Sequence, residues 1–376
     1  MLILVFNAGS SSLKCQLVDT KSGKALFKSI VDRIGKKECE FRMEVGKKTL
    51  SLHPKVKSIT EAMKITTEML FSQKIFGKEK ITGIGQRVVH GGEKYTEPCL
   101  ITPKVLKEIV RLSSLAPLHN PPNIEGIQAA QKMFKGLPQI AVFDTQYYKD
   151  LPIETYLYPV PIEWYKHFGV RKYGFHGISH EYVTQQALKK MKGILSFSKQ
   201  KNVKIISCHL GNGCSITASL GGKAVDTSMG FTPLEGIPMG TRSGSIDPAL
   251  VPYLAKKLKV TAEKVVDLLN KESGLKGVSG GLSSDMRTIH IEATKMNAAA
   301  QLAYMIFIDR TAKQIAAYTS VLRGLDALVF TAGIGENATY AHKDILSRLA
   351  HLNKFKTFII PTNEELHIAQ LSAKLL

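Results

Sequence analysis

The 376-residue sequence has no G-x-x-x-x-G-K-[ST] run, and this absence excludes a P-loop nucleotide site. It has five cysteines, an odd number, and no C-x-x-C pair. This pattern favours free thiols in a reducing cytoplasm over a disulfide framework or a zinc site. No apolar run is long enough to span a bilayer, and the first residues lack the basic segment of a secretory signal. We therefore expect a cytoplasmic protein with no membrane partner.

Acidic residues are scarce, because 31 Asp and Glu stand against 51 Lys and Arg and leave a formal net charge of +20. Such a balance can mark a nucleic-acid-binding protein. The lysines, however, are spread along the chain and mixed with acids, without an alternation of basic and aromatic residues. We expect a solvated basic surface that helps to steer anionic substrates, and no nucleic-acid partner.

The first eighteen residues read as a strand, a turn of small residues and a second strand. A short apolar run, Leu2 to Phe6, is followed by Asn7 to Ser12, whose small side chains let backbone approach a ligand closely. Apolar and polar residues then alternate, and Lys14 lies just past the turn. Hydroxyls, N–H groups and one ammonium suit an anion such as a nucleotide phosphate. An ordinary solvated hairpin would show the same pattern.

The same layout recurs from Val203 to Leu220, where the turn is His209-Leu210-Gly211-Asn212-Gly213. A third strand-to-glycine passage runs from Leu325 to Asn337. Two strand–turn–strand units in separate halves indicate a duplicated α/β fold that grips one nucleotide from both sides. The chain length also favours two domains, with the crossing near residues 152–161.

Further candidate functional residues lie at strand ends and in a long loop. Arg87 precedes paired glycines at a strand end, where it suits either anion capture or plain surface exposure. Asp144 follows the strand Ile140 to Phe143, a position that often faces a crevice. Arg242 lies in the long loop from Met229 to Pro248, and loops of this length are usually functional. We also expect helices at 60–76, 103–115, 296–308 and 311–322, a rigid proline-rich loop at 116–123, and Ser179 as a helix cap.

A set of short motifs resembles those of the acetate kinase family, in the family's order and over almost the whole chain. They are NAGSSSLK, RVVHGG, PLHNP, FDT, YGFHGISH, HLGNG, FTPLEG, MGTRSG, SSDMR, AGIGEN and PTNEEL. The resemblance implies an α/β architecture of duplicated actin-like ATPase (ribonuclease H-like) domains, each with a β-β-β-α-β-α-β-α core, and a nucleotide cleft between them. We accordingly expect an N-terminal domain at 1–148 plus 366–376 and a nucleotide-binding C-terminal domain at 149–365.

The resemblance also implies a phosphotransferase. The reaction would be reversible transfer of the γ-phosphoryl group of ATP to acetate, giving acetyl phosphate and ADP. It implies Mg²⁺, with Mn²⁺ as an alternative ion, and a homodimer. A propionate or butyrate kinase of the same family is the alternative function. Two rivals come from other classes: a nicotinamide dehydrogenase resting on the G-x-G-x-x-A pattern of Gly333 to Ala338, and a non-enzymatic ATP-binding module.

Roles of individual residues follow from the same motifs. The expected magnesium-binding residues are Asn7 and Glu364. The expected catalytic residues are Asp144, His176 and Arg242, with His119 nearby. Arg87 would bind the substrate carboxylate, beside an apolar pocket of Val89, Leu118, Phe175 and Pro233. The expected nucleotide contacts are Lys14, His209, Leu210, Gly211, Asn212, Gly213, Asp285, Met286, Arg287, Gly333, Ile334, Gly335, Glu336 and Asn337.

The chain departs from the family's usual pattern at several positions: Gln86, Gln146-Tyr147-Tyr148, Ser245 and the run from Thr339 to Asp344. The role of Asp144 follows from chemistry, since a carboxylic acid of pKa near 4 is already ionised at neutral pH. No proton then needs removing from acetate. We expect Asp144 to organise the magnesium shell or to orient Arg87 or Arg242, unless it is only a structural acid.

Overall fold

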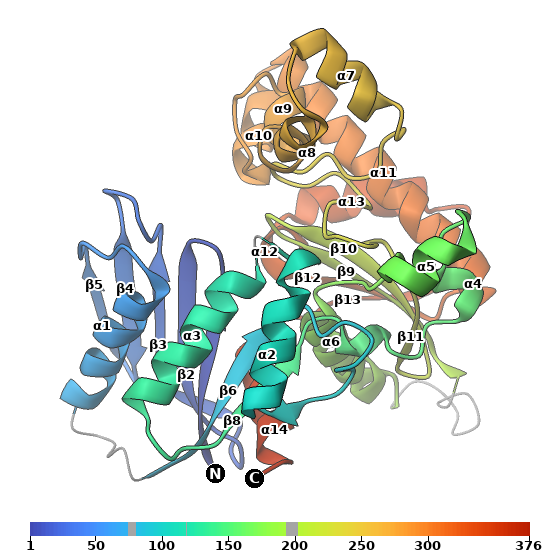
Figure 1. The fold of residues 1–376 in the computed structure, drawn as a ribbon. Coiled ribbons are helices and arrows are strands. Elements are labelled where there is room, and N and C mark those ends of the chain that lie inside the picture. The colour runs from blue at the N-terminus through green and yellow to red at the C-terminus, as the bar shows by residue number, and fades with distance from the viewer. Residues whose placement is uncertain (74–79, 118, 193–201) are drawn as a thin grey trace. The chain divides into compact units, whose positions relative to one another are not determined.

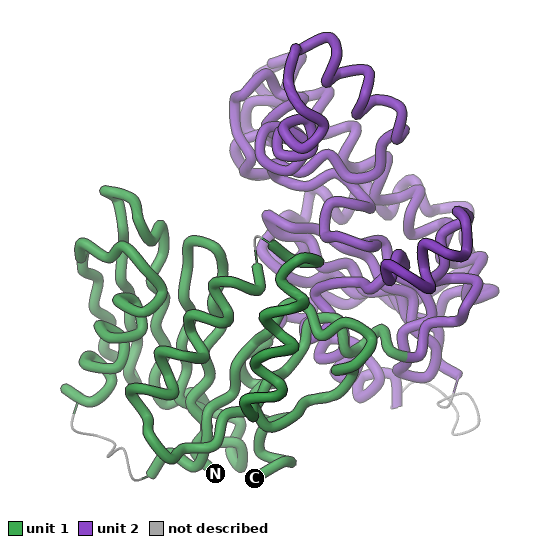
Figure 2. The backbone as a smooth tube through the Cα atoms, viewed as in Figure 1, with its two compact units in different colours: residues 1–149, 363–376 green, residues 150–362 purple. Residues whose placement is uncertain are grey.

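A computed structural model describes residues 1–73, 80–117, 119–192 and 202–376 (Figure 1). The chain forms two compact units, one of residues 1–149 with 363–376 and the other of residues 150–362 (Figure 2). These boundaries lie close to the expected 148/149 and 365/366, and the difference transfers Glu364 to the first unit. Leu118 and part of the helix expected at 60–76 lie outside the described residues.

The first unit is built on a mixed eight-stranded sheet with the order β5-β4-β3-β2-β1-β6-β8-β7. β1, β2 and β3 pair antiparallel, whereas β6 pairs parallel with β1 and with β8. Its strands are β1 (Leu2–Ala8), β2 (Ser12–Asp19), β3 (Lys24–Asp32), β4 (Glu40–Val45), β5 (Lys48–Leu52), β6 (Ile81–Val88), β7 (Cys99–Leu100) and β8 (Gln139–Phe143). Its helical segments are α1 (Ile59–Ser72), α2 (Pro103–Arg111), η2 (Leu112–Ser114), α3 (Asn120–Met133), η3 (Gln146–Tyr148) and α14 (Glu364–Ala373).

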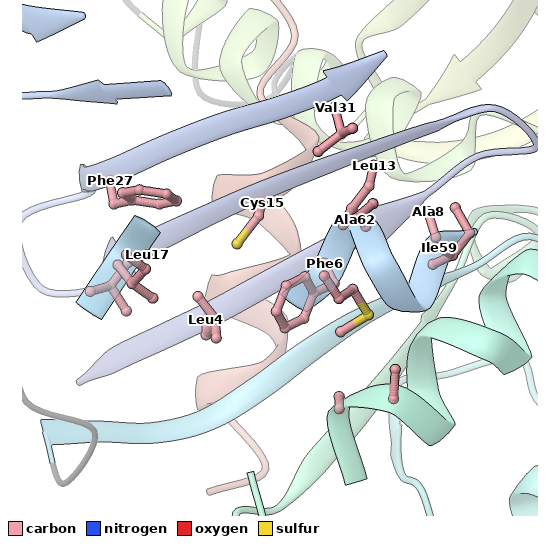
Figure 3. Close-up of a cluster of buried hydrophobic side chains, with 14 of the residues drawn as sticks. Leu4, Phe6, Ala8, Leu13, Cys15, Leu17, Phe27, Val31, Ile59 and Ala62 are labelled. Carbon is pink, nitrogen blue, oxygen red and sulfur yellow. The ribbon is translucent and has the colours of Figure 1, made fainter. Parts of the chain in front are cut away.

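One face of this sheet packs on α1 and α3. The alternation expected in the second strand is present, since Leu13, Cys15 and Leu17 are fully buried while Lys14 is exposed. Together with Leu4 and neighbouring side chains they form the apolar cluster shown in Figure 3. Burial of a large apolar side chain contributes about 1.5–3 kcal/mol, so this cluster anchors the strands whose ends carry the site.

The other side of the sheet receives α14, the last helix of the chain. Two glycines of β6 make the close approach possible: a Cβ on Gly83 would come within van der Waals overlap of Leu376, and one on Gly85 would lie 2.7 Å from Ile368. Asn363 caps the helix by accepting from the Leu366 N–H at 3.1 Å. The acidic first turn of α14 is thereby brought to the end of β1.

The second unit repeats the central strand order, β11-β10-β9-β12-β13, again with three antiparallel strands followed by parallel ones. The predicted duplicated α/β fold is confirmed. Its strands are β9 (Lys204–Leu210), β10 (Cys214–Leu220), β11 (Lys223–Thr227), β12 (Ala327–Thr331) and β13 (Lys356–Ile359). Its helices are α4 (Ile153–Tyr156), α5 (Ile162–Phe168), α6 (Gly177–Met191), α7 (Leu250–Leu258), α8 (Ala262–Lys271), α9 (Gly274–Val278), α10 (Met286–Thr294), α11 (Ala298–Leu322), α12 (Ala332–Asn337) and α13 (Thr339–Arg348).

Three local predictions were wrong. The segment expected as a rigid loop enters α3 at Asn120, because Pro121 and Pro122 occupy the first helical turn, where a missing N–H costs nothing. The helices expected at 296–308 and 311–322 are one continuous helix, α11. Ser179 does not cap α6, which begins at Gly177. None of the helices in the described part of the chain has the length and apolar character needed to cross a bilayer.

Candidate active site

In the first unit, Arg87 and Asp144 meet at the carboxyl ends of two parallel strands. β6 and β8 pair from Ile84↔Gln139 to Val88↔Phe143, so Asp144 directly follows the last pair, close to the end of β6 that carries Arg87. Arg87 Nη2 donates to Asp144 Oδ2 at 2.7 Å. The Asp144 side chain is 1% exposed and that of Arg87 17% exposed. Such a short charge-assisted bond fixes the plane of the guanidinium.

Asn7, at the end of β1, connects this pair to the start of α14. Its Oδ1 accepts from Arg87 Nη1 at 3.3 Å. Its Nδ2 donates to Glu365 Oε1 at 3.0 Å and to Glu364 Oε2 at 3.4 Å. Glu365 also accepts from Gln16 at 3.4 Å. The structure thus brings the two expected metal residues together with Arg87 and Asp144.

Acidic side chains outnumber basic ones in this group. Asp144, Glu364 and Glu365 face Arg87, with Lys14 as a second cation that acts on Glu364. Burial raises the pKa of Glu364, the charges of Glu365 and Asp144 raise it further, and Arg87 and Lys14 oppose them. Burial alone would lower the pKa of Arg87, but Asp144 and Glu364 leave it raised. The arrangement therefore favours an additional cation close to Glu364.

Two buried asparagines of α3 hold the strand ends in place. Asn123 accepts from the Val89 N–H at 3.0 Å and donates to the Ala8 carbonyl at 2.7 Å, which joins the ends of β6 and β1. Asn120 accepts from the His90 N–H at 3.1 Å. Burial lowers the pKa of His90 to about 4, so this histidine is neutral. The PLHNP and RVVHGG motifs are in direct contact.

In the second unit, His176 immediately precedes α6 and has a left-handed backbone conformation, with φ of 56°. Its ring stacks on that of His209 at a centroid distance of 4.2 Å. His209 lies at the end of β9, where its Nδ1 is 2.8 Å from Ser179 Oγ. A positive φ is uncommon outside glycine and is often found at functional positions.

The loop from Met229 to Pro248 places Arg242 beside these rings. A Cβ built on Gly213 would lie 3.2 Å from His176 Nε2 and 3.5 Å from Arg242 Nη1, so both groups border the space beside that glycine. Arg242 Nη1 donates to the Pro233 carbonyl at 3.2 Å. Burial lowers the pKa of Arg242, yet an arginine remains charged.

A cavity of about 640 Å³ in the second unit gathers three of the expected nucleotide segments. Asp285 caps α10 by accepting from the Thr288 N–H at 2.9 Å, which fixes the SSDMR turn at its edge. Tyr340, from the unusual run after AGIGEN, also lines the cavity, and its ring stacks on His290 at 3.6 Å. The lining residues are Gly211, Asn212, Ser284, Asp285, Met286, Arg287, Gly333, Ile334, Asn337, Ala338 and Tyr340.

The remaining expected residues have other positions. Leu210 and Gly335 are buried, and Glu336 accepts from the N–H groups of Ala332 and Thr362. Lys14 is an exposed residue of β2 in the first unit. Of the expected acyl pocket, Val89 and Phe175 are buried, Pro233 is half-buried and Leu118 lies outside the described residues. His119, which is half-buried, immediately precedes α3.

Four residues of these sites were not expected from the sequence: Glu365, His180, Ser215 and Tyr340. Glu365 lies inside the PTNEEL motif and His180 inside YGFHGISH, so both had a signal. Among the departures from the family, Ser245 exchanges hydrogen bonds with Gly236, donating its N–H to the Gly236 carbonyl and accepting from the Gly236 N–H. Gln86 donates to Gln139 at 3.0 Å within the sheet. These two departures therefore have local structural partners.

Comparison with known proteins agrees with the motif set. A model of the acetokinase family matches residues 2–354. An acetate kinase of Geobacillus sp. (strain WCH70) is 45% identical over 391 residues, with 98% of this chain and 97% of the relative covered. An acetate kinase of Thermoanaerobacter pseudethanolicus is 43% identical over 402 residues, with 100% and 99% covered.

Solved structures give the same result for the fold. A propionate kinase from Francisella tularensis superposes with a TM-score of 0.92 at 40% identity, with 98% of each chain covered. Porphyromonas gingivalis acetate kinase superposes with a TM-score of 0.88 at 34% identity, with 100% of this chain and 99% of that one covered. The chain has the duplicated actin-like fold of these enzymes, and it belongs to the acetokinase family.

Proposed function

We propose that the chain is an acetate kinase, which transfers the γ-phosphoryl group of ATP reversibly to acetate and forms acetyl phosphate and ADP. The observation that carries the proposal is the match to the acetokinase family over residues 2–354, together with relatives named acetate kinase that are 43–45% identical over almost the full chain. The charged groups of each unit supply the chemistry that this reaction needs.

We assign the acceptor to Arg87. A guanidinium can hold a carboxylate through two parallel N–H···O bonds, and Asp144 and Asn7 fix this one in place. Acetate is ionised at neutral pH and attacks through a carboxylate oxygen, so no base has to remove a proton. Asp144 therefore serves as a positioning residue for Arg87.

We assign the nucleotide to the 640 Å³ cavity of the second unit, with the adenosine beside Arg287, Ile334 and Tyr340. His176 and Arg242, which border the space beside Gly213, would donate to the oxygens of the transferring phosphoryl group. Phosphoryl transfer depends on positioning and on neutralising charge more than on covalent help. Fixed N–H donors supply this stabilisation with little reorganisation.

Magnesium fits the residues at the start of α14. Among the described residues no cluster of three or more His, Cys, Asp or Glu side chains could enclose a metal. Mg²⁺ needs no such cage, since it is usually held by one or two carboxylates, waters and substrate phosphates. Glu364 offers hard carboxylate oxygens beside Asp144 and Glu365, and Asn7, which donates to Glu364 through Nδ2, would add its Oδ1 only by leaving Arg87 Nη1. When bound, the ion would neutralise the phosphates of the nucleotide.

Acyl preference is a second question, because the propionate kinase from Francisella tularensis superposes with a TM-score of 0.92. We propose acetate as the preferred substrate, with the buried Val89, two residues after Arg87, as an apolar neighbour of its methyl group. One further methylene gains about 0.8 kcal/mol if it is accommodated, whereas overpacking costs about 1–3 kcal/mol. Propionate should therefore be used less well than acetate, and butyrate less well again.

One assay tests both statements. The protein is incubated with ATP, Mg²⁺, hydroxylamine and acetate, propionate or butyrate, and hydroxamate is measured. Hydroxamate should form with acetate and disappear with EDTA. Equal ATP turnover with and without a carboxylate would disprove the proposed function. A kcat/KM that rises from acetate to butyrate would instead favour a longer-chain acyl kinase.

We also propose that the enzyme works in the cytoplasm as a homodimer. Large apolar side chains of the second unit are exposed in the single chain, among them Trp164 (48%), Phe168 (69%), Tyr253 (58%) and Met305 (55%). Trp164 and Phe168 lie four residues apart on α5, hence on one side of that helix, and contiguous exposed apolar surface favours association. Light scattering coupled to size-exclusion chromatography tests the proposal. A species of about 41.4 kDa at micromolar concentration would contradict the dimer.

A further inference from the structure

A chain of hydrogen bonds runs behind His176 and has no role in the function proposed above. Ser215 Oγ of β10 lies 2.8 Å from His176 Nδ1 and 2.7 Å from His180 Nε2. His180 Nδ1 lies 2.7 Å from Ser207 Oγ of β9. His180, Ser207 and Ser215 are all 0% exposed, so bulk water does not complete this chain.

The hydrogen atoms available restrict how the chain can be arranged. A serine hydroxyl has one hydrogen, and a neutral imidazole carries hydrogen on one of its two nitrogens. Burial, and then the charge of His209, lowers the pKa of His180 well below its ordinary value, so its ring is neutral. Within the described residues the hydroxyl of Ser215 has the two imidazoles as its hydrogen-bond partners.

When His176 is also neutral, each ring has two tautomers, and two of the four combinations satisfy every group. If both rings carry hydrogen on Nε2, His180 donates to Ser215 and Ser215 donates to His176. If both carry it on Nδ1, every bond is reversed. If both rings donate to Ser215, its own buried hydrogen lacks an acceptor, and if neither donates, one ring nitrogen faces a lone pair. An unsatisfied buried group of this kind costs about 1–3 kcal/mol.

The position of His176 selects between the two combinations. Its Nε2 borders the space beside Gly213, which Arg242 also borders. A hydrogen on Nε2 makes the neutral ring a donor toward a phosphoryl oxygen, whereas the reversed chain presents a lone pair to a negative group. The ring face is already occupied, because His209 stacks on it at 4.2 Å.

We propose that His180 acts through Ser215 to hold His176 in the tautomer that carries its hydrogen on Nε2. His180 and Ser215 are then positioning residues, and His176 is the group that contacts the transferring phosphoryl. The linkage of the two rings rests on the hydrogen-bond geometry together with neutral rings. The choice of Nε2 rests on the proposed function.

The first test is the ring ¹⁵N spectrum of the full-length protein labelled at histidine, with His176→Gln and His180→Gln used for assignment. In the wild-type protein His176 and His180 should both carry hydrogen on Nε2. Ser215→Ala should convert His176 to a mixture of tautomers. Neutral rings with the hydrogen on Nδ1 in one ring and on Nε2 in the other would overturn the linkage. Hydrogens on Nδ1 in both rings would overturn the choice of tautomer. The wild-type spectrum tests the linkage even if Ser215→Ala fails to fold.

Kinetics provide the second test. Ser215→Ala should lower kcat about 10- to 100-fold, as expected when a functional histidine loses the hydrogen-bond partner that orients its ring. The KM values for acetate and ATP should stay within about twofold of wild type. Ser215→Thr, which keeps the hydroxyl, should recover most of the loss. The control is Ser228→Ala, a buried serine of the same unit whose hydroxyl accepts from the Ile216 N–H at 2.9 Å. Equal losses of kcat in Ser215→Ala and Ser228→Ala would mean a structural role only. A wild-type protein that forms no acyl phosphate would defeat the proposed function, while the spectrum would still test the linkage.

Discussion

Replacement of Asp144 by asparagine separates the three roles open to this carboxylate: base, magnesium organiser and positioning residue. The side chain keeps its shape, and an amide oxygen can still accept from Arg87 Nη2, now 2.7 Å from Oδ2. Only the charge is lost. The expected consequence is a guanidinium held less firmly, with kcat/KM for acetate reduced by about 10²-fold or more, the scale of a small misplacement in an active site.

The effect on stability should be smaller than for an isolated buried pair. Removing one partner of a buried ion pair costs about 3–5 kcal/mol when the other charge is left uncompensated. Here Glu364 and Glu365 remain close to Arg87, and their mutual repulsion with Asp144 is relieved. We therefore expect the free energy of unfolding to fall by about 1–2 kcal/mol. The same loss of charge should lower the pKa of Glu364, on which Asp144 acts as a raising charge.

The assay is a pair of pH profiles of kcat from about pH 5 to 9 at saturating Mg²⁺, with urea unfolding of both proteins. Asp226→Asn serves as the control, because Asp226 pairs with Lys172 at 2.8 Å and has 17% exposure in the second unit. The control should lose stability but keep kcat. The pH profiles of kcat for the wild type and for Asp144→Asn should have the same shape. A wild-type kcat that rises with pH through an ionisation missing in Asp144→Asn would establish a base and refute the reasoning.

Three further predictions follow from other residues. The pKa of Glu364 is raised in the folded protein, which therefore binds this proton more tightly than the unfolded chain, and stability is lost as the pH rises from about 4.3 through the folded pKa. Metal-free Glu364→Gln should therefore have a higher melting temperature than the wild type at pH 7 to 8 and respond less to Mg²⁺. A melting temperature below that of the wild type in EDTA would contradict this. Arg242→Ala should lower kcat about 10³-fold or more, the scale of an arginine that stabilises phosphoryl transfer, and a value within tenfold of wild type would show that it is misassigned. Tyr340→Ala should weaken ADP binding, measured by calorimetry, by roughly tenfold, since base–aromatic stacking contributes about 1–3 kcal/mol. Tyr340→Phe should bind ADP as the wild type does. Unchanged affinity in the alanine variant would show that Tyr340 does not contact the base.

The sequence determined the repeated core because that core depends on local patterns. The alternation of Leu13, Cys15 and Leu17 about Lys14 is itself the burial pattern of β2. The small residues after Phe6 and after Leu210 contain the turns at 9–11 and 211–213, although β1 continues through Asn7 and Ala8, and the strand ends near Arg87 and Asp144 follow from short apolar runs. These features depend on the alternating side-chain period of a strand and on the backbone freedom of glycine, which a sequence displays directly.

Other features depended on contacts between residues that are far apart in the chain. Glu364 and Asn7 are separated by almost the whole sequence, and they meet because Gly83 and Gly85 let α14 pack closely on β6. The proline-rich segment became the start of α3 because its asparagines could satisfy the ends of β1 and β6. A single sequence shows what each residue can donate or accept. The pairing of His176 with His180 through Ser215 was decided by tertiary structure, because buried polar groups must find partners wherever the packing of strands and helices brings them.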